Sequence, residues 1–363
     1  MNIQNLLSDL GQSALFPHLE KRSSAEKTHF SNQLALIANK WEGGPKKIEK
    51  KPIPFGETDC FPFYSTLNDP PQKKRSMVIL FAAGLASRMQ LNLPKILTPI
   101  AKNRTILDWI AQDMLQASPD TSLWIMSSTE GFSAVSSYVQ SRSFPLKKIE
   151  IFSQGNYPFF SKQGGFILGK HPPIVEVPRG NGDVFSALAK APFCTEKALQ
   201  EVDYVHFVNC DLFLSEMVST PLESALEQFQ VDLTFQVFPR GKEPTLGVVQ
   251  SQNTAARIYE YSEYLLPEKG GFANVGHYCM RAKTLQTLLN RPVHLPMHWA
   301  EKNHQGVEGY KGERFFFDIF PYLQKVLPVV FPKNQVYQSV KTVQDLSNIQ
   351  KQIQDKVHLS PFD

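Results

Sequence analysis

One segment of the chain combines a small-residue loop with two positive charges. The apolar run Met77–Phe81 leads into Ala83 and Gly84, and Arg88 and Lys95 follow, seven residues apart. An apolar run that ends in small residues is typical of a buried strand that carries a loop to a sheet edge, where backbone N–H groups can approach a ligand. Two cations beside such a loop suit a polyphosphate better than a neutral molecule. The segment therefore predicts a nucleotide-phosphate site, although a strand and turn with solvated cations would share the pattern.

The composition is that of a soluble globular chain without nucleic-acid or membrane partners. Of 363 residues, 42% are hydrophobic and 20% are charged, and the formal net charge of +4 is too small for a nucleic-acid binder. No window approaches the roughly 18 apolar residues of a membrane span, and the N-terminus lacks the features of a signal peptide. The four dispersed cysteines indicate neither disulfides nor a zinc site. We therefore expect a cytoplasmic protein.

Three parts of different character follow one another along the chain. Apolar residues at helical intervals predict two or three amphipathic helices from Ile3 to Trp41, and the prolines of residues 43–75 predict a linker. Beyond the linker, strand-like and helix-like runs alternate, which indicates β-α-β units. The alternating runs are Met77–Phe81, Ile106–Ala117, Ser122–Met126, Lys147–Phe152, Val184–Lys190, Tyr204–Val208, Leu222–Gln230 and Leu233–Val237.

These runs predict an α/β fold with a Rossmann-like, mainly parallel sheet flanked by helices, a helical N-terminal segment and a short C-terminal extension. The expected divisions are residues 1–72 for the N-terminal helices and linker, 73–328 for the main domain, and 329–363 for the extension. Ligands are expected at the carboxyl ends of the parallel strands.

Motifs spread along the chain share the order and spacing of one enzyme family. They are Leu7–Leu15, Ala83–Arg88 with Pro94–Lys95, Ile151–Pro158, Pro178–Phe185, Gly247–Val249, Glu260–Glu263, Phe272–Val275 and Phe316–Phe320. Together they resemble the UDP-sugar pyrophosphorylases, most closely the eukaryotic-type UDP-N-acetylhexosamine pyrophosphorylases. That family makes a UDP-sugar and pyrophosphate from UTP and a sugar 1-phosphate. The resemblance therefore implies a nucleotidyltransferase with these small-molecule substrates, and a nucleotide loop that contains Ala83 and Gly84.

The resemblance also implies which residues bind the nucleoside. Gln154 would read the uracil edge, a task for which an amide is suited because it offers a donor and an acceptor together. Gly180, Asn181 and Gly182 would open a helix whose backbone N–H groups meet the uracil and ribose. Without the resemblance, Gln154 would read as a polar residue in a turn after a strand, and a lone G-N-G turn is a weak signal.

A carboxylate and three sugar-binding residues complete the implied site. Asp211 follows the apolar run Tyr204–Val208, where a strand-end carboxylate could hold Mg²⁺ against the α-phosphate. An Asp in such a position also commonly caps a helix or turn. In the family, the counterparts of Gly247, Glu260 and Asn274 contact the hexose, with Glu260 accepting hydrogen bonds from its hydroxyl groups. Taken alone, Glu260 would read as a surface acid.

The resemblance further places Lys341 at the phosphates and implies an in-line reaction. The sugar phosphate oxygen would attack the α-phosphorus of UTP while Arg88 and Lys95 neutralise the departing pyrophosphate. Lys341 would draw the two phosphate groups together, and no general base is needed because the attacking oxygen is already ionised. An isolated lysine is ordinarily solvated, so the role of Lys341 depends on the family resemblance.

Some positions differ from the family pattern. Alanine stands at Ala83 and Ala86 where relatives have glycine, and Arg179 stands where they commonly have an acid. Asp183 and residues 340–342 are similar to the UDP-glucose enzymes. Two alternatives therefore stay open: a UTP–glucose-1-phosphate uridylyltransferase, and a catalytically weak UDP-sugar-binding regulatory protein.

Overall fold

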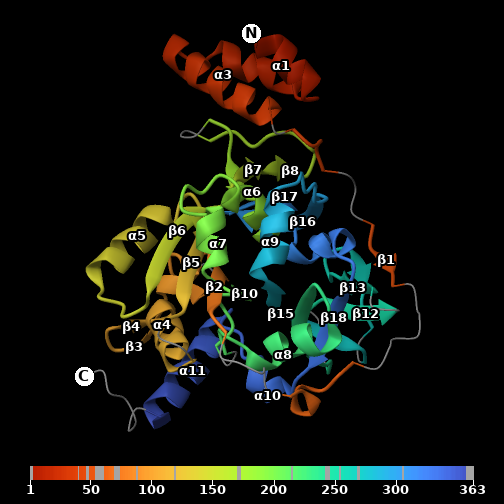
Figure 1. The fold of residues 1–363 in the computed structure, drawn as a ribbon. Coiled ribbons are helices and arrows are strands. Elements are labelled where there is room, and N and C mark those ends of the chain that lie inside the picture. Colours follow the sequence, from red (N-terminus) through yellow and green to blue (C-terminus); the bar gives the residue numbers. More distant parts are fainter. Residues whose placement is uncertain are drawn as a thin grey trace.

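The centre of the molecule is a nine-stranded sheet with helices on both faces (Figure 1). The computed structural model describes residues 3–39, 41–45, 49–53, 61–68, 74–86, 89–117, 120–169, 173–213, 216–241, 246–252, 255–267, 270–304 and 306–356. The strands of the central sheet are β2 (Ser76–Phe81), β5 (Ser122–Ser127), β6 (Lys148–Ser153), β10 (Tyr204–Asn209), β11 (Leu233–Pro239), β12 (Val248–Gln252), β13 (Ala255–Tyr259), β15 (Phe272–Arg281) and β18 (Val326–Val330).

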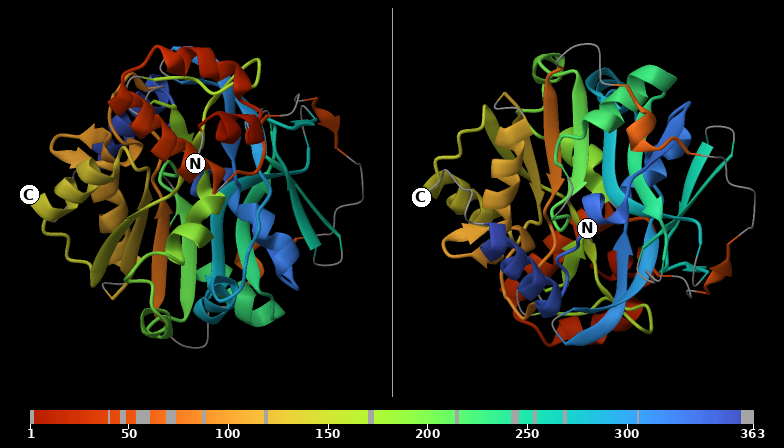
Figure 2. Two further views of the ribbon diagram at one scale, coloured as in Figure 1. Left: turned by 90° about the horizontal axis from the view of Figure 1, so that it is seen from above. Right: turned by 90° about the horizontal axis from the view of Figure 1, so that it is seen from below.

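The sheet has a parallel half and a mixed half. Its main order is β13-β12-β15-β10-β2-β5-β6, and β11 pairs with both β15 and β18. Strands β10, β2, β5 and β6 are parallel to one another, as expected for β-α-β units. Strand β15 runs antiparallel to β10, and β12 and β13 form an antiparallel hairpin. The expected α/β fold is thus confirmed, and the parallel strands lie side by side in both views of Figure 2.

Helices cover the two faces because the strands are apolar on both sides. In β2, Val78 and Leu80 face one hydrophobic cluster, while Met77, Ile79 and Phe81 face the other. Helices α4 (Ile106–Ala117), α5 (Phe132–Ser141) and α8 (Thr220–Phe229) contribute to the first cluster. Helices α6 (Val184–Leu188), α7 (Glu196–Gln200) and α9 (Ala282–Leu289) contribute to the second. Fully buried strands of this kind read as continuous apolar runs.

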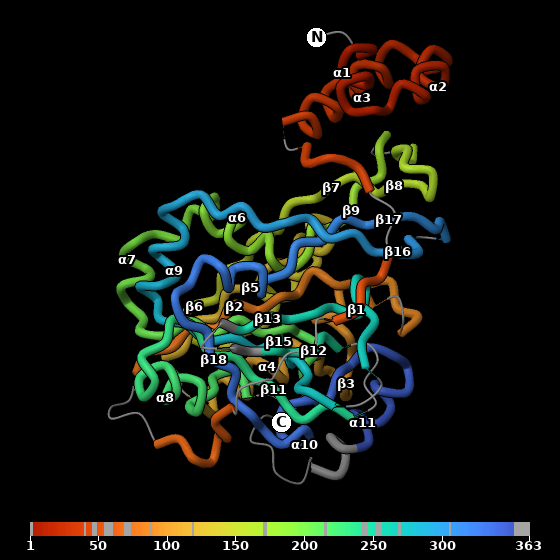
Figure 3. The backbone as a smooth tube through the Cα atoms, turned by 90° about the vertical axis from the view of Figure 1, so that its right-hand side faces the viewer, coloured from red at the N-terminus to blue at the C-terminus, as the bar shows by residue number. Residues whose placement is uncertain are grey.

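Three N-terminal helices lie apart from the sheet, beside β7 and β8 (Figures 1 and 3). They are α1 (Ile3–Asp9), α2 (Phe16–Glu20) and α3 (Ser24–Ala38), and their apolar faces pack around Tyr157 and Phe160. Gly11 follows α1 with a φ of +66°, which favours glycine. The buried Gln12 side chain donates to Gly164 O at 3.1 Å and accepts from the N–H of Phe166 at 2.9 Å. This part of the N-terminal motif is therefore a structural anchor.

Shorter elements line the edges of the sheet. The strands are β1 (Lys51–Pro52) with β14 (Tyr264–Leu265), β3 (Pro99–Ala101) with β4 (Arg104–Thr105), β7 (Asn156–Pro158) with β9 (Glu176–Pro178), and β16 (His298–His304) with β17 (Val307–Glu313) and β8 (Phe160–Ser161). The 3₁₀ turns are η1 (Ser13–Leu15), η2 (Tyr64–Thr66), η4 (Lys95–Leu97), η5 (Asn181–Asp183) and η6 (Phe316–Tyr322). The chain ends in α10 (Lys333–Val336) and α11 (Val343–Lys356). None of the described helices is both long enough and apolar enough to cross a membrane.

Candidate active site

The predicted site residues gather at one edge of the sheet. Because β2, β6 and β10 are parallel, the loop at Gly84, the side chain of Gln154 and the side chain of Asp211 all follow strand ends at that edge. Strand β15 is antiparallel, so Asn274 near its start lies at the same edge. The N–H of Asn274 donates to Gly247 O at 3.0 Å, which brings the start of β12 to this edge as well. Residues far apart in the sequence therefore meet where parallel strands end.

Lys95 and Asp211 form an ion pair beside the nucleotide loop. The Nζ of Lys95 lies 3.0 Å from Oδ2 of Asp211, and both side chains are mostly buried. The backbone N–H of Lys95 donates to Gly84 O at 2.8 Å, and a methyl group placed on Gly84 would lie 3.6 Å from Cε of Lys95. The side chain of Lys95 therefore lies in van der Waals range of Gly84, beside the nucleotide loop.

Lys341 joins this pair from the C-terminal part of the chain. The N–H of its neighbour Val340 donates to Asp211 O at 3.0 Å. Burial raises the pKa of Asp211, but the charges of Lys95 and Lys341 outweigh burial and lower that pKa below its usual value. Asp345, in the first turn of α11, accepts from the N–H groups of Lys341 and Thr342 at 2.9 Å each. The start of α11 therefore fixes the backbone of Lys341 beside Asp211.

The two alanines of the nucleotide loop cause no backbone strain. Among the described residues, the only non-glycine positions with a positive φ are Gln90, Asn103 and Gln230. Ala83 and Ala86 therefore have backbone conformations that any residue adopts, and Ala86 is buried in the core beneath the loop. Backbone strain therefore gives no reason for weak activity at these two positions. Arg88 lies outside the described residues, so its predicted role stays a prediction.

Gln154 is a buried amide whose acceptor oxygen is unused. Its side chain is 3% exposed, and Oε1 has no hydrogen-bond partner in the part of the chain that the structure describes. The backbone N–H of Gln154 donates to Ser127 O at 3.0 Å, which ties the residue to the end of β5. Residues 153–156 also line a cavity of about 690 Å³ together with Arg179 and Asp183. A buried acceptor without a partner is costly unless a ligand donates to it.

The Gly180-Asn181-Gly182 turn packs directly on another backbone segment. Gly180 has a φ of +92°, and a methyl group on it would lie 2.5 Å from Arg314 O. The N–H of Gly182 donates to Arg314 O at 2.9 Å, and the N–H of Phe316 donates to Oδ1 of Asn181 at 2.9 Å. The two glycines are therefore required by close packing, and their predicted contacts with uracil and ribose stay a prediction.

Arg179, which stands where relatives commonly have an acid, forms ion pairs with two acidic residues of this chain. Its guanidinium lies 3.6 Å from the carboxylate of Asp183, and it also pairs with Glu42 at 3.7 Å. Arg314 pairs with the same two acids. Asp183 in turn accepts from the N–H of Gly155 at 2.6 Å. This network holds the Gln154 loop, the turn at Gly180 and the N-terminal segment together.

The predicted sugar residues meet at the opposite end of the site from Gln154. A methyl group on Gly247 would lie 2.8 Å from Oε1 of Glu260, so the glycine admits that carboxylate. Asn274 donates from Nδ2 to the hydroxyl of Tyr278 at 2.9 Å. Burial and then the charge of Glu313 raise the pKa of Glu260 to about 7, against opposing effects of nearby cations. Glu260 is thus a shielded carboxylate and not a surface acid.

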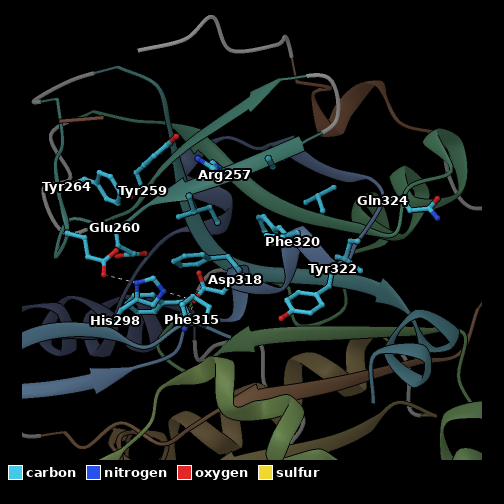
Figure 4. Close-up of a pocket in the computed structure, with 18 residues that line it drawn as sticks. Arg257, Tyr259, Glu260, Tyr264, His298, Phe315, Asp318, Phe320, Tyr322 and Gln324 are labelled. Atoms are coloured by element: carbon cyan, nitrogen blue, oxygen red, sulfur yellow. Dashed lines mark hydrogen bonds and ion pairs between the residues drawn. The ribbon is translucent and has the colours of Figure 1, made fainter. Parts of the chain in front are cut away.

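His298 is a residue of this end that sequence reasoning missed. Its Nδ1 lies 2.7 Å from Oε1 of Glu263, and its Nε2 lies 2.8 Å from Oδ2 of Asp318 (Figure 4). Burial lowers the pKa of His298, but the hydrogen bonds to Asp318 and Glu263 prevail and raise it to about 9. The sequence pointed to His298 only indirectly: its partners Glu263 and Asp318 belong to the motifs Glu260–Glu263 and Phe316–Phe320.

The donor set around Asp211 fits a metal ion only if a nucleotide supplies further oxygens. Among the described residues, no three His, Cys, Asp or Glu side chains are grouped to hold a metal. Mg²⁺ commonly binds one or two carboxylates together with substrate phosphates, and Asp211 can provide one such oxygen ligand. The predicted magnesium site therefore stays a prediction.

Comparison with known proteins gives matches to one family. The family described as UTP–glucose-1-phosphate uridylyltransferase matches residues 29–278. A relative from Encephalitozoon cuniculi, described as a probable UDP-N-acetylglucosamine pyrophosphorylase, is 24% identical over 76% of this chain and 83% of its own length. A protein of the same description from Caenorhabditis elegans is 24% identical over 75% of this chain and 67% of its own.

Solved structures support the fold. A UDP-glucose pyrophosphorylase from Leishmania major, in complex with UDP-glucose, superposes with a TM-score of 0.70 at 16% identity, over 96% of this chain and 79% of the other. The uridine diphosphate N-acetylglucosamine pyrophosphorylase of Trypanosoma brucei superposes with a TM-score of 0.65 at 16% identity, over 95% of this chain and 83% of the other. At this identity the likeness concerns the fold alone.

Proposed function

The chain belongs to the UTP–glucose-1-phosphate uridylyltransferase family, and we propose that it makes UDP-N-acetylglucosamine and pyrophosphate from UTP and N-acetylglucosamine 1-phosphate. The choice of sugar is supported by the names of the relatives from Encephalitozoon cuniculi and Caenorhabditis elegans. It is also supported by the motif around Glu260, which resembles the corresponding motif of UDP-N-acetylhexosamine pyrophosphorylases. The reaction moves a uridylyl group from one phosphate to another, so the site must hold two phosphorylated substrates end to end.

The observation that carries the proposal is the position of Lys341. Its charge acts on Asp211 at the nucleotide loop and also on Glu260 at the sugar end. We infer that a cation with both neighbours would lie near the point where the phosphate of the sugar meets the α-phosphate of the nucleotide. With Lys95 beside it, this region carries the positive charge that two anionic substrates need in order to approach each other.

The chain's own residues would act by orientation and by charge. Gln154 would accept from the N3–H of uracil through its unused Oε1 and so select the base. Lys95 would exchange its ion pair with Asp211 for the phosphates of the departing pyrophosphate. Lys341 would hold the attacking sugar phosphate in line with the α-phosphorus. The attacking oxygen is already ionised near neutral pH, so no side chain need remove a proton.

A magnesium ion, held by Asp211 and by nucleotide phosphate oxygens, would supply additional neutralisation of the charge on the triphosphate. The ion pair between Lys95 and Asp211 would then open when nucleotide and metal bind together. This proposal makes Asp211 a residue with two alternative cationic partners.

Formation of UDP-glucose from glucose 1-phosphate is the second candidate. It is supported by the description of the matching family. It is also supported by Asp183, because the UDP-glucose enzymes resemble this chain in having Asp at this position; Asp183 accepts from the N–H of Gly155. The two candidates differ only in the sugar, so a direct comparison of the two sugar phosphates separates them.

The experiment is a pyrophosphate-release assay with UTP, CTP, dTTP and ATP, each with N-acetylglucosamine 1-phosphate and with glucose 1-phosphate. The proposal expects the highest kcat/KM for UTP with N-acetylglucosamine 1-phosphate. A higher value with glucose 1-phosphate would support the second candidate. Absence of release from every pair would contradict both candidates and leave the regulatory binding protein.

A further inference from the structure

His298 lies at the start of β16 and reaches two turns that come from other parts of the chain. One turn begins at Glu260, whose carbonyl accepts from the N–H groups of Glu263 at 3.1 Å and Tyr264 at 3.0 Å. The other is the start of η6, where the carboxylate of Asp318 accepts from the N–H of Phe315 at 3.2 Å. Because both acceptors of His298 are carboxylates, its ring donates from both nitrogens, which is the bonding of an imidazolium.

The two turns are the walls of a cavity next to the sugar end. The cavity has a volume of about 570 Å³, and Glu260, Glu263, His298 and Asp318 line it (Figure 4). The ring of His298 packs on the ring of Phe315, with centroids 4.8 Å apart. The next residue, Phe316, donates its backbone N–H to Asn181. A single side chain therefore connects the Glu260 turn to η6 and, through η6, to the turn at Gly180.

The surroundings of His298 are acidic and shielded from water. Its side chain is 16% exposed, and the side chain of Asp318 is 13% exposed. The charged and titratable groups that face it or act on its acidic neighbours include Glu260, Glu263, Glu313, Asp318, Lys302, Lys311, Lys341, Tyr264 and Tyr278. Without the charge of His298, several carboxylates would share a small volume and repel one another. The carboxylate of Glu263 would then lose the hydrogen bond and the positive charge that hold it in position, and the Glu260 turn would lose its connection to η6.

We propose that His298 is a positioning residue for sugar recognition, which holds the Glu260 turn against η6 by donating one hydrogen bond to Glu263 and one to Asp318. This inference rests on the proposed function, because it assigns Glu260 to the sugar. It adds that recognition of the sugar depends on the charge of a histidine that does not itself touch the substrate.

Two substitutions separate the two hydrogen bonds. His298→Asn places an amide N–H near the position of Nδ1 and retains the bond to Glu263, whereas His298→Gln places one near Nε2 and retains the bond to Asp318. We expect His298→Gln to raise the KM for the sugar 1-phosphate about tenfold, because a charge-assisted hydrogen bond to the turn of Glu260 is lost. His298→Asn should raise it to a similar extent, because loss of the bond to Asp318 also separates the Glu260 turn from η6. The KM for UTP should change less than about twofold in both variants, since the nucleotide contacts are intact.

A pH profile provides a readout that a purely structural role would not move. The wild-type KM for the sugar 1-phosphate should rise as pH passes about 9, where His298 loses its proton. His298→Gln should lack that rise, because its amide does not titrate. His304→Gln, on the same strand β16, is the matched control and should keep the wild-type KM values and pH profile.

Calorimetric titration with UDP-N-acetylglucosamine and with UDP keeps this inference separate from the proposed activity. His298→Gln should weaken binding of UDP-N-acetylglucosamine and leave binding of UDP unchanged. Equal changes for both ligands, or a wild-type KM for the sugar 1-phosphate in His298→Gln, would overturn the role of His298. Failure of the wild-type protein to release pyrophosphate would instead overturn the proposed function, and the comparison of the two ligands would still decide the role of His298.

Discussion

The phosphate end and the sugar end of the site use opposite balances of charge. At the phosphate end, two cations, Lys95 and Lys341, lower the pKa of one carboxylate, Asp211. At the sugar end, the imidazole of His298 lies between two carboxylates, and Glu260 nearby has its pKa raised to about 7. The first arrangement has positive charge to offer an anion, whereas the second has acceptors for the hydroxyl and amide donors of a sugar. In the proposed reaction, this difference in charge would assign the phosphates to one end and the uncharged sugar ring to the other.

The largest expected effect comes from removing a cation at the phosphate end. Lys341→Ala and Lys95→Ala should each reduce kcat about a hundredfold or more, because each removes a charge that stabilises the reacting phosphates. The melting temperature of Lys341→Ala should stay close to that of the wild type, whereas Lys95→Ala should melt lower because it leaves the mostly buried carboxylate of Asp211 without its ion pair. Steady-state pyrophosphate release and thermal unfolding measure the two quantities.

Lys283→Ala on α9 is the matched control for these lysine variants, because Lys283 is an exposed lysine. It should keep wild-type turnover. Wild-type turnover in Lys341→Ala as well would remove the phosphate end from the mechanism.

At the sugar end, Glu260→Gln should weaken binding of the sugar 1-phosphate while increasing the stability of the fold above pH 7. It should raise the KM for the sugar 1-phosphate about tenfold, because a carboxylate acceptor is replaced by a neutral one. Burial raises the pKa of Glu260 from 4.5 to about 7, so the folded state binds more protons than the unfolded state in that range. The free energy of unfolding therefore falls as pH rises from about 4.5 to about 7, and above pH 7 the charged Glu260 is destabilising.

Glu260→Gln should consequently melt at a higher temperature than the wild type at pH 8, and the difference should shrink as pH falls towards 4.5. Thermal unfolding followed across that pH range measures the effect. A lower melting temperature of Glu260→Gln at pH 8 would show that Glu260 is not held in an unfavourable ionised state.

Substitution of Gln154 tests whether its side chain recognises the uracil base. Gln154→Ala should raise the KM for UTP about tenfold and reduce the preference for UTP over CTP, because the unused acceptor Oε1 is removed. The KM for the sugar 1-phosphate should not change. An unchanged ratio of kcat/KM for UTP and CTP would place base recognition elsewhere.

The smallest expected effect is a pH dependence of stability from His298. The pKa of His298 is raised from 6.5 to about 9 in the folded state, so its contribution is fully present below pH 6.5 and is lost as pH rises through 9. The difference in melting temperature between the wild type and His298→Gln should therefore shrink between these pH values. A constant difference across this range would mean that the imidazole is not charged in the folded protein.

The parts of the fold that depend on local pattern could be predicted from the sequence. Helix α4 occupies the predicted residues Ile106–Ala117, and β2 and β10 begin or end within a residue of their apolar runs. Such runs are diagnostic because strands buried on both faces are continuously apolar. The antiparallel direction of β15 was not predictable in this way, since pairing between β15 and β10 joins residues far apart in the sequence, such as Tyr204 with Arg281.

The candidate site could be predicted only in part. Gln154 and Lys341 were predicted through the family resemblance, and Asp211 was predicted from its place after an apolar run. The parallel strands explain why Gln154 and Asp211 share an edge. The packing role of Gly180 and Gly182 was missed, because the segment that requires it lies at Arg314, far along the chain. His298 was missed because its partners are 35 and 20 residues away, and no periodic pattern connects them.

The division of the site into a phosphate end and a sugar end can be checked by measuring pyrophosphate release from UTP and N-acetylglucosamine 1-phosphate in Lys341→Ala, in Glu260→Gln and in the wild type. We expect a loss of kcat of about a hundredfold in the first variant and a selective rise of the sugar-phosphate KM in the second. The same kinetic change in both variants, or none in either, would contradict a site divided into a phosphate end and a sugar end.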